Sequence, residues 1–585
     1  MSNSNFPVKS IVLGDVAIEN YSIVKQTKLP AVDYAATELQ KYIKAACGAN
    51  LPICEEAAAN TIFLNIEQVD SAFTDSFKIS VKDNNLILSG NNERAIIYAV
   101  YTFLEKYIGC RYYTADVERI IPTEKIAVPN GTLHSEKPIL EYREPMYITN
   151  FKSHALCLKQ KINSDRSNRT TTIEGTGGSI TYNGFVHTLA SLLPKEKYFE
   201  EHPEYFAFYD GERHDTQPCL SHPDVLKIVT EEVLRRLREN PQRITSVSFN
   251  DNLFYCTCPE CAKIDKEEDS HMGTLIRFVN AIADEVKKEF PDVMVDTLAY
   301  QQSRKPPKLT VPRDNVIIRL CSIECCFNHS LDDPNCSAED KNCCENIKFR
   351  QEIEDWNKIC DYLYIWDYGI NFAHYLAPFP HYKAMLKNMR FFADHHAKGI
   401  LEQGNYNGDG ADFNEMHSYL AAKLLWNPYT TDEEYEELIK DFLEGFYGKG
   451  WEYIYKYLQI LEESVIDRHF NFEAGVFRYL DKFANRIDEV NELWDKAEAL
   501  ATNEEELKRI RKTRLSVLYC DVLLRYEERA AKSPESKAQL FKDNELLYSR
   551  FFEYGLRLCE WYTLVEDQPD LTKRIDEWVH DRPYP

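Results

Sequence analysis

The chain has 585 residues, of which 28% are charged and 44% are hydrophobic, and its mean hydropathy is −0.47. This composition excludes a disordered chain and predicts a soluble protein with room for about three or four domains. The formal net charge of −25, with no long Lys/Arg run to offset it, argues against a nucleic-acid or anionic-lipid partner. No apolar stretch reaches the roughly 18 residues of a membrane-spanning helix, so no membrane insertion is expected.

Targeting and redox signals are weak. The segment from Met1 to Phe6 lacks the charged and apolar regions of a signal peptide. The chain as given therefore predicts no leader, and a periplasmic or cell-surface location would require that one had been removed. The 17 cysteines are an odd number in a long chain, which does not fit a small disulfide scaffold. The cysteine count therefore does not decide between an oxidising and a reducing compartment.

The first region, residues 1–130, alternates helical and strand patterns. Residues 31–44 place apolar side chains on one face of a helix, and residues 92–107 do the same before a helix stop near Gly109. Short strands are predicted at residues 62–64, 77–81 and 86–88. A small α/β domain without a catalytic motif is expected here, with a scaffold or accessory role.

Residues 131–425 repeat a strand, a loop and an amphipathic helix, as a parallel barrel requires. The first strand is expected near residues 146–149, and Ser221 to Asp224 is interpreted as a capping box that opens a helix. Further strands are predicted at residues 244–249, 293–299, 316–320, 362–365 and 399–401. The pattern predicts an α/β protein with a central (β/α)8-like (TIM) barrel, complete or not. Residues 426–585 become helical and charged, which predicts a C-terminal α-helical domain that supports the barrel.

Polar and aromatic residues follow the predicted barrel strands, where such barrels hold their active sites. Amides and carboxylates bind sugar hydroxyls, and aromatic faces stack on pyranose rings, so carbohydrate chemistry is the leading prediction. A single acidic residue at a strand end is more often a solvated loop anchor, but four strands each supply one. The candidates are Asn250, Asp251, Tyr300, Gln301, Glu324, Trp366, Asp367, Tyr368, Glu402 and Asn405, with His187 on an early loop.

The pair Asn250-Asp251 has the most specific chemical interpretation. Glycoside hydrolysis needs a proton donor, and a 2-acetamido sugar can supply its own carbonyl oxygen as the nucleophile. Asp251 could then be the acid while Asn250 contacts the acetamide, and Glu324 is the rival acid or the second carboxylate. The alternative is a simple turn, because Asn and Asp both favour turns. The sequence leaves open whether Asp251 or Glu324 donates the proton.

Several motifs resemble known families. The run from Phe249 to Asp251, the cysteine-bearing segment from Tyr255 to Cys261, and residues 297–300, 317–325 and 365–368 resemble the central domain of glycoside hydrolase family 163, which is typical of gut Bacteroides. Residues 35–42, 98–107 and 109–113 are similar to the N-terminal domain that precedes α-glucuronidase barrels. Together these resemblances span most of residues 6–425.

The resemblance to family 163 implies an endo-β-N-acetylglucosaminidase. It would cleave the GlcNAc-β1,4-GlcNAc core of complex N-glycans or glycoproteins, with retention of configuration through the acetamido group, and without a cofactor. Two alternatives stay open. An α-glucuronidase-like or other exo-acting hydrolase would need basic groups for a uronate, for which Arg304 and Lys305 are the nearest candidates. A non-catalytic glycan-binding protein would need only the aromatic lining.

Cys256, Cys258 and Cys261 have ligand-like spacing for zinc, but a site would need a fourth ligand. His271 or a cysteine from a later cysteine-rich stretch, residues 321–344, could supply it. This spacing is not that of a standard zinc knuckle, and buried thiols or disulfides are the favoured interpretation. No catalytic metal is predicted. The later stretch is expected to shape the wall of the site.

Overall fold

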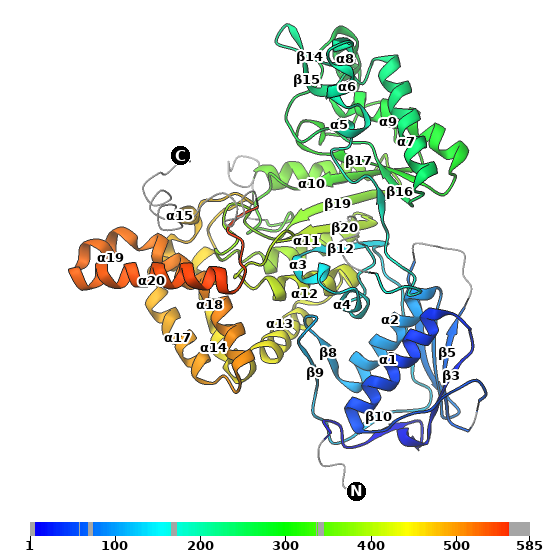
Figure 1. The fold of residues 1–585 in the computed structure, drawn as a ribbon, viewed down its shortest axis with the longest axis vertical. Helices are drawn as coiled ribbons and strands as arrows, with labels where there is room; N and C mark the ends of the chain where they lie inside the picture. Colours follow the sequence, from blue (N-terminus) through cyan, green and yellow to red (C-terminus); the bar gives the residue numbers. More distant parts are fainter. Residues whose placement is uncertain are drawn as a thin grey trace.

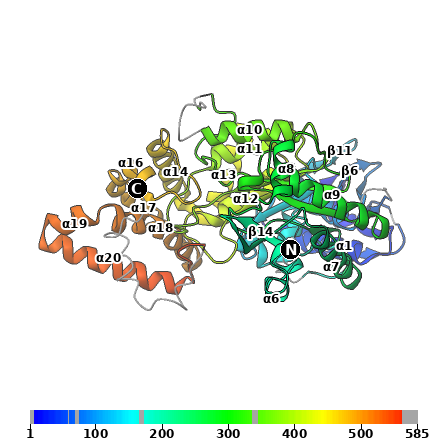
Figure 2. The same cartoon turned by 90° about the horizontal axis from the view of Figure 1, so that it is seen from above.

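A computed structural model describes residues 6–57, 59–67, 74–164, 172–334, 336 and 344–560. The N-terminal α/β region and the C-terminal helices lie on different sides of a central parallel sheet (Figure 1). Seen from above, these two regions occupy opposite ends of the molecule (Figure 2). Residues 561–585 of the predicted C-terminal domain lie outside the described part of the chain.

The N-terminal region is a six-stranded mixed sheet in the order β11-β6-β7-β5-β3-β4, covered by α1 (Pro30–Cys47) and α2 (Glu93–Phe103). Its strands are β3 (Ser22–Lys25), β4 (Ile53–Cys54), β5 (Thr61–Ile66), β6 (Phe77–Lys82), β7 (Asn85–Gly90) and β11 (Leu133–Glu136). Both predicted helices are present. The second continues into a π-helical turn, Leu104–Ile108, and ends at Gly109 with φ 85°, where glycine avoids left-handed strain.

Smaller strands complete this region. A three-stranded sheet has the order β10-β1-β2, and β8 and β9 form a hairpin. Their bounds are β1 (Ile11–Leu13), β2 (Val16–Ala17), β8 (Cys110–Tyr112), β9 (Glu118–Ile120) and β10 (Ile126–Val128). The region has its own hydrophobic core, built mainly from α1, α2 and the inward side chains of the strands.

The central region is a curled parallel sheet with the order β12-β20-β19-β18-β17-β16-β13. Each neighbouring pair of strands is parallel. The strands are β12 (Tyr142–Met146), β13 (Tyr182–Asn183), β16 (Ile244–Ser246), β17 (Met294–Ala299), β18 (Val316–Cys321), β19 (Leu363–Tyr368) and β20 (Gly399–Gln403). The predicted α/β class with a barrel-like sheet is confirmed, in the form of a curled half-barrel whose described strands number seven.

Three local predictions were wrong. The first strand ends at Met146 rather than starting there, because α3 (Ile148–Phe151) begins almost immediately afterwards. β16 stops at Ser246, three residues early. The cap of α7 (Pro223–Glu239) is His222, whose Nδ1 accepts a hydrogen bond from the Asp224 N–H at 3.2 Å. The missed strand β13 is two residues long, which is too short for alternation to reveal.

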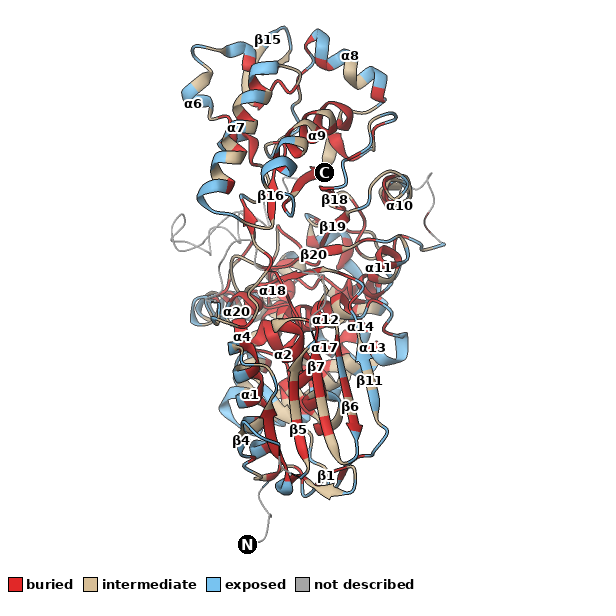
Figure 3. Cartoon of the chain, turned by 90° about the vertical axis from the view of Figure 1, so that its right-hand side faces the viewer, coloured by how far each residue is buried: buried red, intermediate tan, exposed pale blue. Residues whose placement is uncertain are grey.

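The interior of the curled sheet is packed solid. Arg319 of β18 pairs with Asp296 of β17 at 3.2 Å, and both side chains are fully buried. The guanidinium lies over the rings of Tyr142 and Tyr182. The strands are buried along almost their whole length (Figure 3), so we expect reactive groups at the carboxyl ends of the strands, where such sheets hold their active sites.

Helices cover the outside of the sheet and extend from it. α9 (Met272–Glu289) lies between β16 and β17, whereas α10 (Cys344–Trp356), α11 (Tyr382–Asp394) and α12 (Asn414–Trp426) follow β18, β19 and β20. A lobe projects at the top of Figure 1, with exposed helices in Figure 3, and contains α5 (Leu189–Leu192), α6 (Lys195–Tyr198), the hairpin β14 (Phe206–Tyr209) and β15 (Glu212–Pro218), and α8 (Pro259–Glu268). α4 (His154–Lys159) packs near α2.

The C-terminal helices share one hydrophobic core with the curled sheet. They begin at a capping box in which Thr431 and Glu434 satisfy each other's backbone N–H groups. The helices are α13 (Asp432–Tyr447), α14 (Trp451–Val465), α15 (Val476–Tyr479), α16 (Asp481–Ala484), α17 (Ile487–Ala499), α18 (Glu504–Leu524), α19 (Tyr526–Lys532) and α20 (Pro534–Glu553). Among the described residues, no helix combines the length and apolar character needed to cross a membrane.

A buried ion triad joins the N-terminal region to the curled sheet. Asp75 precedes β6 and is fully buried, and its carboxylate meets Arg143 of β12 at 2.6 Å and Arg94 of α2 at 3.0 Å. Burial alone would raise the pKa of Asp75, but the two guanidinium groups outweigh it and lower that pKa to about 2. The triad therefore stays charged at neutral pH.

Candidate active site

Asp251 lies in the loop after β16, and its side chain is 66% exposed. Tyr300, which directly follows β17, donates a hydrogen bond from its hydroxyl to Asp251 Oδ1 at 3.3 Å. Burial raises the pKa of Tyr300, and the charges of Asp251 and Glu324 raise it further. Three predicted residues from three successive strands, Asp251, Tyr300 and Glu324, therefore share one neighbourhood.

Strained backbone surrounds this group. Val186, His187 and Gln301 have φ values of 28°, 51° and 50°, in the left-handed region that non-glycine residues rarely adopt. Such strain persists where the surrounding structure enforces it, and it gathers at functional sites. Two of these strained residues contact the group: His187 Nε2 lies 4.0 Å from Asp251 Oδ1, and Gln301 Nε2 lies 3.0 Å from the Tyr300 hydroxyl.

The His187 ring has a defined orientation. Its Nδ1 lies 2.8 Å from the carbonyl oxygen of Phe249, so Nδ1 carries the proton and donates it. In the neutral ring, Nε2 is then the lone-pair nitrogen, and it faces Asp251. The T-shaped contact of the His187 and Tyr300 rings, with centroids 5.9 Å apart, holds this arrangement. The predicted substrate-binding residue His187 thus lies beside Asp251.

Asn250 is engaged within the protein. Its Oδ1 accepts a hydrogen bond from the Ala190 N–H at 2.7 Å, and its Nδ2 donates to the Thr216 carbonyl at 2.9 Å. The fully buried Gln217 pairs with the Asn250 backbone in both directions, at 2.9 and 3.0 Å. Asn250 therefore ties the loop after β16 to α5 and β15 and fixes the backbone that carries Asp251. Nothing in the sequence marked Gln217, because its partners Asn250 and Asn252 are distant in the chain.

Glu324 is part of an ion cluster. Its carboxylate lies 2.7 Å from Arg304 Nη1, and the same guanidinium contacts Glu345 at 3.0 Å and Glu352 at 2.5 Å. Arg304 is 7% exposed, so its charge is shared among three carboxylates rather than offered to solvent. Lys305 points elsewhere and pairs with Asp269 at 2.7 Å.

Aromatic groups continue the inner face. Trp366 and Tyr368 of β19 lie on the same face, with ring centroids 6.3 Å apart, and the Trp366 indole donates to Gln403 Oε1 at 2.8 Å. Phe185 packs against Trp366 with centroids 5.7 Å apart. Trp366 is 9% exposed and Tyr368 only 3% exposed. These rings form a mostly buried floor, and Phe185 is a member that the sequence interpretation did not select.

Two predicted carboxylates lie on the opposite face of the sheet. Asp367 and Glu402 are partners in the register of β19 and β20, one position out of phase with Trp366 and Tyr368. Alternation along a strand therefore turns both carboxylates outward, under the covering helices. They are 3% and 0% exposed. Asn405 is also fully buried and bonds the Gly408 carbonyl at 2.8 Å. The structure does not bring these three residues to Asp251.

The outer carboxylates form a distinct group, here termed the outer cluster: Asp367, His381, Glu402 and Asp412. Neither Glu402 oxygen has a hydrogen-bond partner among the described residues, and His381 Nε2 lies 3.8 Å away. Burial raises the pKa of Glu402 to about 8, and burial together with Glu402 raises that of Asp367 to about 8. Burial also lowers the pKa of His381 to about 4. Asp367, His381 and Glu402 are therefore largely uncharged at neutral pH.

The cysteines form two separate groups. Cys256, Cys258 and Cys261 meet Cys219, which the sequence interpretation missed, and all four are buried free thiols. The predicted candidate His271 instead contacts Asp265 at 2.7 Å. In the later cysteine-rich stretch, Cys326 groups with His329 and His469, while residues 335 and 337–343 lie outside the described part.

Comparison with protein families decides the affiliation. Residues 112–459 match the family described as "Domain of unknown function (DUF4838)". The chain belongs to the DUF4838 family. In this DUF4838 chain the match covers the curled sheet and all the candidate residues named above. No curated relative matches the sequence.

The solved structures that are similar to this chain include glycoside hydrolases. A GH115 4-O-methyl-α-glucuronidase with specificity for decorated arabinogalactans has a TM-score of 0.55 at 11% identity, over 93% of this chain and 78% of that chain. A GH138 enzyme targeting pectin rhamnogalacturonan II has a TM-score of 0.47 at 10% identity, over 96% and 97%. The structure of CpGH84D has a TM-score of 0.43 at 12% identity, over 98% and 96%. The DUF4838 chain thus has a fold of the kind found in glycoside hydrolases.

Proposed function

We propose that this protein is a glycoside hydrolase whose active site is centred on Asp251, Tyr300 and Glu324. One observation carries the proposal: an exposed carboxylate is hydrogen-bonded to a tyrosine, with a second carboxylate close by, at the carboxyl ends of adjacent parallel strands. A proton donor and a second polar group beside the scissile bond are what glycoside hydrolysis requires. The backbone strain at His187 and Gln301 supports the same location.

At a finer level, the proposed substrate is the GlcNAc-β1,4-GlcNAc core of complex N-glycans, cleaved as by an endo-β-N-acetylglucosaminidase. The motifs that resemble glycoside hydrolase family 163 include Asp251, Tyr300 and Glu324 themselves. A 2-acetamido group also suits the polar set around Tyr300, since its N–H needs an acceptor and its carbonyl needs a donor.

The proposed reaction assigns the proton to Asp251. The acetamido carbonyl oxygen attacks the anomeric carbon, while Asp251 donates a proton to the leaving glycosidic oxygen and the bond between that oxygen and the carbon breaks. Water, deprotonated by Asp251, then attacks the same carbon and opens the cyclic intermediate, which retains configuration. Asp251 is preferred over Glu324 because it is exposed and has no ion pair with an arginine among the described residues, whereas Glu324 is bound to Arg304 at 2.7 Å. Glu324 would position substrate.

The uronate alternative has less support. A uronic acid carboxylate needs a cation with free hydrogen-bond donors, but Arg304 already contacts three carboxylates. Lys305 is paired with Asp269. The similarity to a GH115 α-glucuronidase concerns the fold alone.

The test uses a desialylated glycoprotein with complex N-glycans. Released glycan is measured by mass spectrometry, which separates cleavage within the GlcNAc pair from loss of terminal sugars. We expect glycans that end in one GlcNAc, with the other left on the protein. No release from this substrate, together with release of glucuronic acid from xylan fragments, would replace the proposal with the uronate alternative.

The choice of proton donor is tested separately. We compare Asp251→Asn and Glu324→Gln on the natural glycan and on an aryl glycoside, whose leaving group needs little protonation. The variant that lacks the acid loses natural-substrate activity but keeps far more activity on the aryl glycoside. We expect this pattern for Asp251→Asn. The same pattern in Glu324→Gln instead would exchange the two roles.

A further inference from the structure

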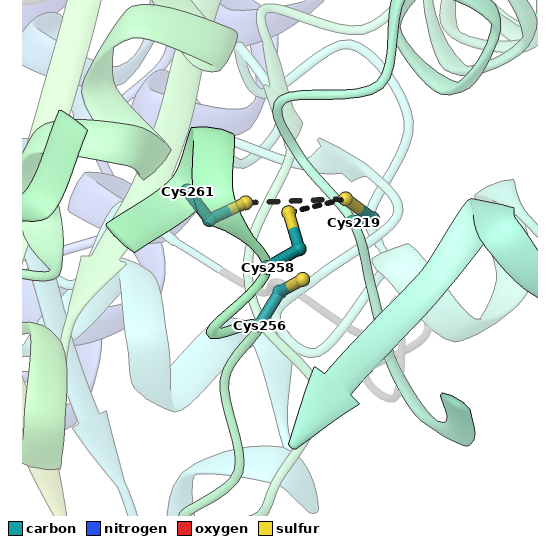
Figure 4. A group of neighbouring side chains, drawn as sticks. All are labelled: Cys219, Cys256, Cys258 and Cys261. Atoms are coloured by element: carbon teal, nitrogen blue, oxygen red, sulfur yellow. Dashed lines mark hydrogen bonds between the residues drawn. The ribbon is translucent and has the colours of Figure 1, made fainter. Parts of the chain in front are cut away.

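Four cysteines from two separate segments meet at one point in the projecting lobe. Cys219 directly follows β15, Cys256 and Cys258 lie in the loop that carries Asp251, and Cys261 is in the first turn of α8. All four are buried, and their sulfur atoms lie within 4.8 Å of one another. Figure 4 shows the four side chains turned toward a common centre. The function proposed above makes no use of them.

The sulfur separations are those of a metal cage rather than of disulfides. Cys219 Sγ lies 3.7 Å from Cys258 Sγ and 3.9 Å from Cys261 Sγ. A disulfide would need about 2.05 Å between sulfurs, and all four are free thiols. Four thiolates at about 2.3 Å from a central zinc ion stand about 3.8 Å apart at the corners of a tetrahedron. The observed separations agree with that tetrahedron.

Hydrogen-bond donors surround the sulfurs. The Phe208 N–H donates to Cys256 Sγ at 3.3 Å, and Arg213 Nη1 lies 3.9 Å from the same sulfur. The Ser221 hydroxyl lies 3.6 Å from Cys219 Sγ and 3.7 Å from Cys258 Sγ, where it can donate, and it accepts a hydrogen bond from the Cys261 thiol at 3.1 Å. Four thiolates around a divalent cation have a net charge of −2, and such outer donors are what stabilises a charged thiolate site. Four uncharged thiols in an apolar core would need none of them.

We propose that Cys219, Cys256, Cys258 and Cys261 bind one Zn²⁺ ion in a tetrahedral structural site. Binding displaces the four thiol protons to solvent and forms four zinc–sulfur bonds, with no change of oxidation state. Four protein ligands leave no open coordination position, so the ion has no direct role in hydrolysis. The site joins the end of the β14–β15 hairpin to the loop after β16.

The zinc site also has a consequence for the proposed active site, and this second part of the inference rests on the proposed function. Asp251 is held from one side by Asn250, which bonds Ala190 and Thr216. On the other side, the loop reaches Cys256 and Cys258. Two fixed points on either side of an exposed carboxylate restrict its position, so loss of zinc is expected to lower activity without removing any group that touches substrate.

The test measures the metal directly. The full chain is purified without chelators, or refolded with Zn²⁺, and zinc is measured by inductively coupled plasma mass spectrometry. We expect about one zinc per chain and four sulfur neighbours at about 2.3 Å by X-ray absorption. Replacement by Co²⁺ should give the intense visible absorption of a tetrahedral site and thiolate charge-transfer bands. If wild type that has been refolded with Zn²⁺ retains well under one ion per chain, the proposal is overturned. An ion bound by nitrogen and oxygen ligands only would also overturn it.

Matched variants locate the ion. Cys219→Ser should lose the bound zinc, whereas Cys54→Ser, at a half-buried cysteine on β4, should keep it. Full zinc content with four sulfur ligands in Cys219→Ser would exclude this site. If Cys219→Ser does not fold, the Co²⁺ spectrum of the wild type still decides between a sulfur site and none. Zinc content and spectrum do not depend on activity, so a zinc-loaded but inactive protein would contradict the proposed function and leave the zinc site intact.

Discussion

The inner and outer faces of the curled sheet both carry polar residues near the carboxyl ends of strands, but these residues differ in solvent exposure and in hydrogen bonding. At the inner site, Asp251 is exposed and hydrogen-bonded to Tyr300. In the outer cluster, Glu402 is fully buried with no hydrogen-bond partner among the described residues. Both are acids near a strand end, yet only the first can meet a substrate. Which face a side chain occupies, rather than its distance from the strand end, decides whether it can act.

The largest expected effect is a difference in hydrolytic activity between a variant on the inner face and a variant on the outer face. Asp251→Asn should lower hydrolysis by about 10²- to 10⁴-fold, the usual contribution of a general acid, with the thermal unfolding midpoint little changed because Asp251 is exposed. Asp367→Asn, the same change on the outer face, should leave hydrolysis close to wild type. Glycan release and thermal unfolding are measured for both. Equal loss of activity in two folded variants would show that the outer face also acts on substrate.

The second expected effect concerns the outer face and is seen in the pH dependence of the free energy of unfolding. The folded protein keeps a proton on Glu402 up to about pH 8, whereas the ordinary pKa of this group is 4.5. The unfolded chain therefore binds fewer protons in this window, and the free energy of unfolding falls as pH rises from 4.5 to about 8, then levels off.

Glu402→Gln removes this pH dependence while keeping the side-chain shape. Since one pKa unit corresponds to about 1.4 kcal/mol, we expect the variant to be more stable than wild type by about 2–4 kcal/mol at pH 8 and nearly equal at pH 4.5. Denaturant unfolding at a series of pH values measures this. An identical slope in both proteins would mean that Glu402 is ionised in the folded state.

A third, smaller effect concerns Asn250. Asn250→Ala removes the two side-chain hydrogen bonds that join the loop after β16 to α5 and β15, and we expect a loss of about 1–3 kcal/mol in stability together with reduced activity. Denaturant unfolding and glycan release are compared. Reduced activity at unchanged stability would instead favour the direct contact between Asn250 and the acetamido group that the sequence predicts.

The smallest effect is expected for Tyr300→Phe. The change removes only the hydroxyl that donates to Asp251 and accepts from Gln301. Loss of one hydrogen bond of about 1–1.5 kcal/mol corresponds to roughly a tenfold fall in kcat/KM. Steady-state kinetics on the natural glycan checks it. An unchanged kcat/KM would show that the Tyr300 hydroxyl does not assist Asp251.

The sequence predicted the layers of this fold because hydrophobic periodicity records which elements are buried. It predicted the neighbourhood of Asp251, Tyr300 and Glu324 because parallel strands end at a common edge. It could not assign Asp367 and Glu402 to a face of the sheet. The predicted strands ended at residues 365 and 401, before either carboxylate, and a shift of one residue along a strand moves a side chain to the opposite face. It also missed Cys219 and Gln217, because their partners are distant in the chain and only folding brings them together.

The triad of Arg94, Asp75 and Arg143 has a consequence for how the chain can be divided. The predicted boundary after residue 130 falls where composition changes, but Arg143 of the sheet depends on Asp75 from the other side of that boundary. A fragment that begins at residue 131 would keep the buried guanidinium and lose its counter-charge, which is a heavier penalty than a newly exposed apolar surface alone. The first region is thus an electrostatic partner of the sheet, and the two belong together in any shortened version of the chain.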